Sequence, residues 1–277
     1  MLDCTGDGPF EHPEYVRACA AHEGSEPFVV TAGAARLILL RRTDGDLHTV
    51  YGYPHPVGQV SEDDLAALAI ALGQIAAPLR VALSPLGCGA LLAEHLIGRI
   101  PIAFERHVCV ADLEGDPLAT FGPKALGMVR RAQNRGVVHD VRTVTPDFGI
   151  LYRSAMESIE ADPLYSFDDA YFSTIAAAGA FEVTARDAHG VCAAAVFLVG
   201  GPQASYHLSA RRADPSPEAG SVNLILLEGL RECARRGATT CILGGGMSGD
   251  PDDPLLRFKA AMATRILPRP TFRRDQA

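Results

Sequence analysis

The sequence predicts a mixed α/β fold in which helices and strands build mixed sheets, arranged as two consecutive units. The first observation is length, because 277 residues exceed the usual domain size of about 100–200 residues. The second is composition: 48% hydrophobic and 21% charged residues are typical of a globular protein. The third is order, since short apolar runs alternate with helical patterns throughout. We expect the whole chain to fold.

The first unit is expected to hold short strands followed by a helix, a strand, a helix and a strand. Ser61 with Asp64 three residues later has the pattern of a capping box, and apolar residues follow at helical spacing to residue 76. The expected strands cover residues 28–33, 35–42, 47–54, 79–85 and 106–113, and the second helix covers 89–98. The unit closes near residue 115.

The second unit opens with a basic amphipathic helix over 122–137, which Gly136 stops. Further helices are expected over 152–159, 167–179, 221–237 and 254–263, with three strands between 181 and 210 and one over 238–244. The order of strand, helix and strand from residue 203 to 244 predicts a right-handed crossover within a mixed sheet.

The charge distribution favours a phosphate-bearing partner in spite of the net charge of −8. An acidic protein repels phosphates by default. However, residues 124–142 hold five Lys or Arg and one acid, and residues 257–274 hold six and none. Two basic segments therefore stand in an acidic chain.

Other classes of site and location have little support in the sequence. The acidic N-terminus lacks the pattern of a secretory signal, and the most apolar window, 65–83, is interrupted by Gln74, Pro78 and Arg80. We expect a cytoplasmic protein without membrane insertion. The seven cysteines contain no C-x-x-C, so we expect mostly reduced core thiols. The histidines show no H-x-x-x-H or H-x-H, which disfavours a metal site.

The stretch "LGGGMSGDPDDPLLRFKAAMA", residues 243–263, is the strongest candidate for a functional site. Its three glycines, Gly244, Gly245 and Gly246, allow the backbone to approach a ligand closely. Asp253 before Pro254 predicts a helix cap, and Phe258 and Lys259 follow one turn later. The alternative is a simple strand exit followed by a core phenylalanine and a solvated lysine.

The layout of the second unit resembles the GNAT superfamily of N-acyltransferases. That resemblance implies a pyrophosphate-binding loop of the pattern Q/R-x-x-G-x-G/A before the helix at 221. The sequence there is "RRADPSPEAGSVN", which keeps only Gly220, contains two prolines, and adds Asp214 and Glu218. Because prolines remove backbone donors and acids repel phosphates, the segment predicts a poor grip on coenzyme A.

Several segments in order resemble the FemABX family of tRNA-dependent aminoacyltransferases, which fuse two GNAT-like halves. They are "YGYPHP", "KALGMVRRAQNRGV", "YSFDDAYF", "SYHLSA", "GSVNLILLEGLRECARRGATTCILGGG" and "DPLLRFKAAM", within residues 51–263. The resemblance implies two tandem GNAT-like domains, over 1–120 and 121–264. The tail, 265–277, is then expected to pack back on the N-terminal domain.

The resemblance also implies roles for individual residues. Lys259 and Phe258 lie where the aminoacyl ester is attacked, and a fixed ammonium there can stabilise negative charge on the carbonyl oxygen. The residues implied at the acceptor are Tyr165 and Tyr206. We add His207 to the acceptor side as a candidate base, on its residue type alone. The residues expected to bind the donor are Gly244, Gly245, Gly246, Lys124, Arg131 and Arg257. Half-buried aromatics, a core histidine and a solvated basic helix are the structural alternatives.

We therefore expect an enzyme that transfers an aminoacyl group from aminoacyl-tRNA to an amine by direct attack. No cofactor is expected, aminoacyl-tRNA being the co-substrate. The segment "EADPLY" lacks the basic residue that family members with a nucleotide precursor carry before their tyrosine, so a small amine acceptor is favoured. The alternatives are an acyl-CoA-dependent N-acyltransferase and a binding module without activity. The sequence leaves the oligomeric state open.

Overall fold

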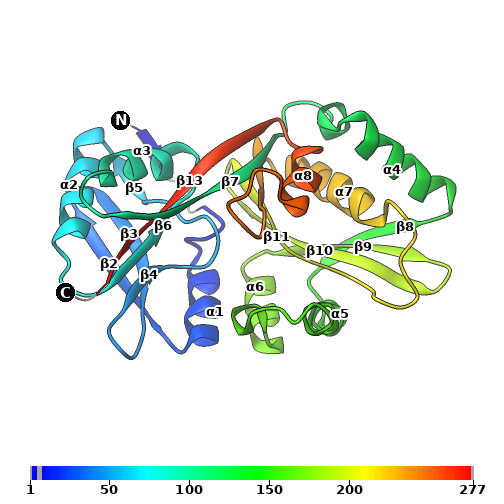
Figure 1. The fold of residues 1–277 in the computed structure, drawn as a ribbon, viewed down its shortest axis with the longest axis horizontal. Helices are drawn as coiled ribbons and strands as arrows, with labels where there is room; N and C mark the ends of the chain where they lie inside the picture. Colours follow the sequence, from blue (N-terminus) through cyan, green and yellow to red (C-terminus); the bar gives the residue numbers. More distant parts are fainter. Residues whose placement is uncertain (1, 5–7, 276–277) are drawn as a thin grey trace.

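In the computed structural model, which describes residues 2–4 and 8–275, one large mixed sheet runs through the molecule (Figure 1). The eleven strands lie in the order β2-β3-β4-β6-β13-β7-β12-β11-β10-β9-β8, and a small second sheet pairs β1 with β5. The strands are β1 Leu2–Cys4, β2 Glu26–Ala32, β3 Ala35–Arg41, β4 Leu47–Thr49, β5 Gly58–Val60, β6 Leu79–Ala82, β7 Ile102–Asp112, β8 Val138–Thr143, β9 Phe181–Asp187, β10 Gly190–Gly200, β11 Gln203–Arg211, β12 Thr240–Gly245 and β13 Arg265–Arg274.

Helices cover both faces of this sheet. Those of the first half are α1 Pro13–Glu23, α2 Glu62–Gln74 and α3 Gly87–Leu96, and those of the second are α4 Pro123–Asn134, α5 Pro146–Ser158, α6 Asp169–Ala177, α7 Ser221–Arg235 and α8 Pro254–Ala260. Short 3-10 turns occupy Pro117–Thr120 (η1) and Pro163–Tyr165 (η2). No helix within these described residues is both long and apolar enough to cross a membrane.

Three large apolar cores separate the layers. One lies between α2, α3 and the first strands, and a second lies between α4, α7, α8 and strands β9 to β12. The third joins α1 to α5, α6 and the opposite face of β10 and β11. Figure 1 shows α5 and α6 on the side of the second half opposite α7 and α8, with α1 beside them. Because α1 belongs to the first half of the chain, this third core ties the two halves together.

The predicted crossover and most predicted elements are present. The capping box at Ser61 forms, since its hydroxyl accepts from Asp64 N–H and the Asp64 carboxylate accepts from Ser61 N–H. Strands β11 and β12 are parallel, and α7 connects them. The expected strand at 47–54, however, ends at Thr49, because Gly52 has φ 110° and the chain turns into a loop there.

Besides the short strands β1 and β5 and the two 3-10 turns, three longer elements were not predicted, each for a local reason. Helix α1 is capped by the ring of His12, which accepts from Glu14 N–H, and histidine is not a usual capping residue. Strand β8 lies at the edge of the sheet and carries mostly exposed side chains. Strand β13 contains Pro268 and Pro270, which argue against a central strand. Those prolines fit because β13 pairs with β7 from Arg265 to Phe272 but with β6 only from Thr271 onward.

The tail that was expected to pack on the N-terminal domain thus contains β13, hydrogen-bonded between β6 and β7. Five cysteines are buried and free: Cys19, Cys109, Cys192, Cys233 and Cys241. Cys88 differs from the expectation, because it takes part in a disulfide.

Candidate functional site

Asp253 organises the glycine-rich stretch, as the sequence predicts. One carboxylate oxygen accepts hydrogen bonds of 2.9 Å from the N–H groups of Met247 and Ser248 and one of 3.0 Å from the Ser248 hydroxyl. The other accepts from Leu255 N–H at 2.9 Å and Leu256 N–H at 3.1 Å. Burial raises the pKa of this carboxyl, but the hydrogen bonds outweigh it and lower the pKa to about 2. The charged carboxylate therefore fixes the loop and the start of α8 together.

Lys259 projects from α8 back toward the end of β12. Its Nζ donates a hydrogen bond of 2.9 Å to the carbonyl oxygen of Gly245 and lies 5.9 Å from the centre of the Tyr206 ring. The side chain is half-buried, and this burial lowers the pKa of the ammonium to about 8, opposed by the negative charges that Cys109 and Asp253 can carry. The group is mainly protonated at neutral pH. Lys259 is therefore not a freely solvated surface charge.

Gly244 is the point of closest approach. It adopts φ 88°, a left-handed conformation that favours glycine. A Cβ atom there would lie 2.8 Å from Lys259 Nζ and 3.2 Å from the hydroxyl of Tyr53. Lys259 and Tyr53 thus both reach this glycine, the first from α8 and the second from the loop after β4.

Tyr53 is held by Arg269 from β13. The guanidinium carbon of Arg269 lies 4.5 Å from the centre of the Tyr53 ring. Arg269 donates to the carbonyl oxygens of Leu83 at 2.7 Å, Ala82 at 2.9 Å and Gly52 at 2.5 Å. Burial raises the pKa of the Tyr53 phenol, and the positive charge of Arg269 opposes that rise. A neutral phenol therefore lies beside the Lys259 site.

Strands β11 and β12 diverge at this position. Their parallel pairing ends with Ser205 opposite Ile242, although both strands continue. On its other side, β11 pairs Tyr206 with Phe197 and then Leu208 with Val196, so His207 is an extra residue in a β-bulge. The backbone at His207 consequently lies outside the paired ladder on both sides, toward β10 and toward β12.

His207 packs among aromatic side chains rather than beside Lys259. Its Nε2 lies 2.8 Å from the Tyr171 hydroxyl, and its ring contacts those of Phe10, Tyr15 and Tyr51 at centroid distances of 5.5 to 6.1 Å. Burial lowers the pKa of this imidazole to about 3. His207 is therefore neutral at physiological pH and a weak base, better suited to orienting Tyr171 than to removing a proton.

The structure brings some of the predicted residues together and leaves others apart. Lys259, Tyr206 and Gly244 to Gly246 lie in one region, and Phe258 is half-buried against the core of the second half. Tyr165 lies against Tyr51, with 6.1 Å between ring centres. Arg257, Lys124 and Arg131 are exposed. The start of α4 does lie beside the end of α8, because Gly122 N–H donates to Ala261 O at 2.8 Å.

Sequence reasoning missed the residues that the first half contributes. Tyr53 and Tyr51 belong to "YGYPHP", which the resemblance singled out without giving either tyrosine a role. Arg269 belongs to the basic segment 257–274, but only the strand register shows that it reaches Tyr53. Tyr171 belongs to "YSFDDAYF", which the resemblance also singled out without giving this tyrosine a role, whereas Tyr15 lies outside every such segment. Both tyrosines meet His207 only through the packing of α1 and α6.

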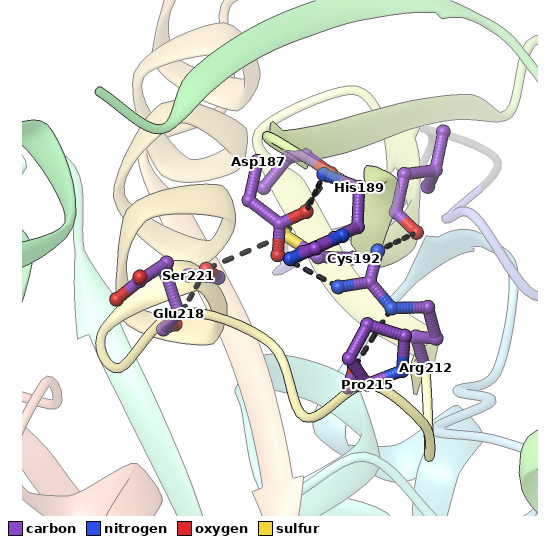
Figure 2. A network of polar contacts seen from close by, with 9 residues as sticks. Asp187, His189, Cys192, Arg212, Pro215, Glu218 and Ser221 are labelled. Atoms are coloured by element: carbon purple, nitrogen blue, oxygen red, sulfur yellow. Dashed lines mark hydrogen bonds and ion pairs between the residues drawn. The ribbon is translucent and has the colours of Figure 1, made fainter. Parts of the chain in front are cut away.

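The loop before α7, where a GNAT protein would hold pyrophosphate, is closed by its own contacts (Figure 2). Arg212 donates to the Asp187 carboxylate at 2.8 Å, to Pro215 O at 2.8 Å and to Val191 O at 3.1 Å. Glu218 O accepts from both the N–H and the hydroxyl of Ser221, which occupies a donor at the start of α7.

Helix α4 covers the same loop from outside. A Cβ atom on Gly220 would lie only 2.0 Å from the carbonyl oxygen of Met128 in α4. The backbone of α4 therefore packs directly on the glycine that remains from the GNAT pattern. Together with the bonds of Arg212, this arrangement explains why the segment resembles the GNAT loop in position but offers phosphate few free donors.

Comparison with solved structures identifies the fold. FemX aligns with a TM-score of 0.64 and 12% identity over 93% of this chain and 90% of its own. The chain has the FemABX-like double GNAT fold. The C-terminal domain, DUF2156, assigned to a lysylphosphatidylglycerol synthetase of Agrobacterium fabrum aligns at 0.62 and 18% over 94% and 86%. L-PGS of Bacillus licheniformis aligns at 0.57 and 14% over 96% and 91%.

The structural resemblance extends over nearly the whole chain, so the FemABX-like fold predicted from the sequence is confirmed. No protein-family model and no curated protein sequence matches the chain. At such low identity the likeness shows the fold alone, and the activity depends on the residues of this chain.

Proposed function

We propose that this chain is an aminoacyltransferase that moves an aminoacyl group from aminoacyl-tRNA to a small amine at the Lys259 site. The observation that carries the proposal is the Lys259 ammonium, half-buried and directed at Gly245 O where β11 and β12 diverge. Near neutral pH most of it is charged, since its pKa is about 8. A cation fixed in such a place can stabilise charge that develops on a carbonyl oxygen.

The proposed reaction is a direct attack. The neutral acceptor amine forms a C–N bond with the ester carbonyl, and the negative charge on the carbonyl oxygen is stabilised by Lys259. The intermediate then expels the ribose oxygen, which takes up the proton that the amine loses. Cys109, which lies beside Lys259, is a poor nucleophile, because burial raises the pKa of its thiol to about 11. Its buried thiol therefore favours a route without an acyl-enzyme.

The loop before α7 supports tRNA over acyl-CoA as the donor. Coenzyme A would need free backbone donors there, and Arg212, Glu218 and the backbone of α4 occupy that place. The names of the structural neighbours agree with an aminoacyl transfer, since one is FemX and another is the C-terminal domain assigned to a lysylphosphatidylglycerol synthetase. The latter name makes a lipid acceptor as compatible with this fold as a small amine.

A transfer assay tests the proposal. Purified protein is incubated with tRNA charged with labelled amino acids, a panel of small amines or phosphatidylglycerol vesicles, and RNase in a parallel tube. We expect a labelled amide that RNase abolishes and that acyl-CoA cannot replace. Labelled lipid in place of the amide would overturn the proposal that the acceptor is a small amine. Product from acyl-CoA that survives RNase would overturn the donor, and no product from any donor would indicate a binding module.

A further inference from the structure

Three guanidinium groups gather on one face of strands β6, β13 and β7. Val81 and Phe272 turn the other face of these strands to α2 and α3. Arg106 is directly opposite Arg269 in the register of β7 and β13, and Arg80 lies on β6. Burial lowers the pKa of Arg269, and the positive charges of Arg80 and Arg106 lower it further. The three side chains are therefore electrostatic neighbours.

An exposed aromatic ring lies between two of these cations. Phe104 on β7 is 39% exposed, which is high for a phenylalanine. The guanidinium carbon of Arg80 lies 5.9 Å from the centre of its ring and that of Arg106 lies 5.3 Å from it. Proteins that bind single-stranded nucleic acid combine an accessible ring, on which a base stacks, with nearby arginines, which neutralise the phosphates.

The positive charge of this face is not neutralised by neighbouring acids. Arg80 and Arg106 are exposed, and neither forms an ion pair with a described residue, that is, within 2–4 and 8–275. Arg273, opposite Arg80 on β13, is instead paired with Asp275 at 2.6 Å. The carboxylate of Glu23 at the border of the face lies 3.3 Å from His48 Nε2. The two free guanidiniums are therefore available to an anion.

This face leads directly to the candidate site. Arg269 belongs both to the cluster and to the site, because it lies over Tyr53, whose hydroxyl reaches Gly244 beside Lys259. A chain of phosphates on Arg80 and Arg106 would thus enter next to the place where the ester is to be attacked. A membrane surface fits less well, because one ring between charged groups offers little apolar area to insert.

We infer that Arg80, Phe104 and Arg106 form a binding site for the single-stranded 3′ end of the donor RNA, Arg80 and Arg106 binding phosphates and Phe104 stacking on a base. The inference rests on the proposed function for the identity of its ligand, a phosphodiester strand. The inference adds a route by which the RNA strand reaches Lys259. This route uses residues of the first half, for which the sequence predicted no role in donor binding.

The test measures binding without catalysis. A fluorescent 12-nucleotide single-stranded RNA ending in CCA is titrated at several salt concentrations with the full chain and its variants. The double variant Arg80→Ala/Arg106→Ala is compared with Arg99→Ala/Arg211→Ala, which removes two exposed arginines elsewhere. We expect the first pair to weaken binding about tenfold and to reduce the slope of log K against log salt by roughly 1.4. Phe104→Leu should weaken binding at least about fivefold with the slope unchanged.

Each outcome decides the inference separately from the proposed function. Equal RNA affinity of the two double variants, with unchanged melting temperatures, would overturn the RNA site even if amide formation proceeds. If Arg80→Ala/Arg106→Ala kept its affinity for RNA but lost binding to phosphatidylglycerol vesicles, the RNA site would be replaced by a lipid site. RNA binding that depends on Arg80 and Arg106 in a protein without transfer activity would support the site and overturn the function.

Discussion

Lys259 Nζ, on helix α8, donates a hydrogen bond of 2.9 Å to the carbonyl oxygen of Gly245, the last residue of strand β12. The bond places a cation at the end of a strand that has just separated from its parallel neighbour. Asp253 holds the loop and helix on which this geometry depends. The relationship makes Lys259 the first residue to test.

Lys259→Ala should reduce kcat/KM by two decades or more, because it removes the charge proposed to stabilise the oxyanion. Lys259→Arg should retain more activity than Lys259→Ala, since it keeps a cation of similar length. Steady-state kinetics with labelled aminoacyl-tRNA measures both, and Arg99→Ala serves as a distant control. Turnover of Lys259→Ala equal to that of the wild type would return Lys259 to a structural role.

The pH dependence of the reaction should show a descending limb near pH 8. The acceptor amine must be neutral to attack, so the rate first rises with pH. Lys259 must be protonated to stabilise the oxyanion, and its pKa of about 8 means that this charge is lost as the pH rises through that value. Lys259→Arg, whose guanidinium stays protonated, should lack the limb. A limb of unchanged position in Lys259→Arg would assign it to another group.

Gly244→Ala should lower the free energy of unfolding by more than the strain of placing alanine in a left-handed backbone conformation. A matched control exists, because Gly115 has φ 90° and open space around its Cβ position, whereas Gly244 has φ 88° and would meet Lys259 and Tyr53. We expect Gly115→Ala to lower the free energy of unfolding by about 1–2 kcal/mol without affecting activity. Gly244→Ala should lower it further and reduce turnover at least about tenfold. Denaturant titration and kinetics of both variants compare the two, and identical effects would exclude a close approach at Gly244.

Acid should destabilise the protein partly through His207. The pKa of this ring is about 3 in the folded chain, against about 6.5 when unfolded. Between these values only the unfolded chain binds the proton, so stability is lost as the pH falls below about 6.5. Because the ring is half-buried, we expect about 1–2 kcal/mol between pH 6.5 and 4.5. His207→Gln should flatten this part of the curve in urea titrations, while the exposed His189→Gln should not. Equal slopes for all three proteins would contradict the assignment.

Local patterns in the sequence were sufficient for the elements around Lys259. Asp253-Pro254 predicted the helix cap that forms, and the apolar spacing after Ser221 predicted α7 between two strands. The contribution of the first half could not be predicted in this way. Tyr53 and Lys259 approach the same glycine, Gly244, only because β4 and β12, far apart in the chain, belong to one sheet. Arg80, Arg106 and Arg269 come together only through the register of three strands. Spacing along a chain does not encode such pairings.

The position of β13 has a consequence for how the protein is made. The strand supplies the hydrogen bonds between β6 and β7 inside the first half, yet it is encoded after the whole of the second half. During translation, the first half of the chain therefore emerges before β13 exists. The position between β6 and β7 in its sheet stays unpaired until residue 274 has been synthesised. The half that emerges first is thus the last to complete its sheet. Deleting the ten residues of β13, at the C-terminal end, would leave the sheet of the N-terminal half without its strand between β6 and β7.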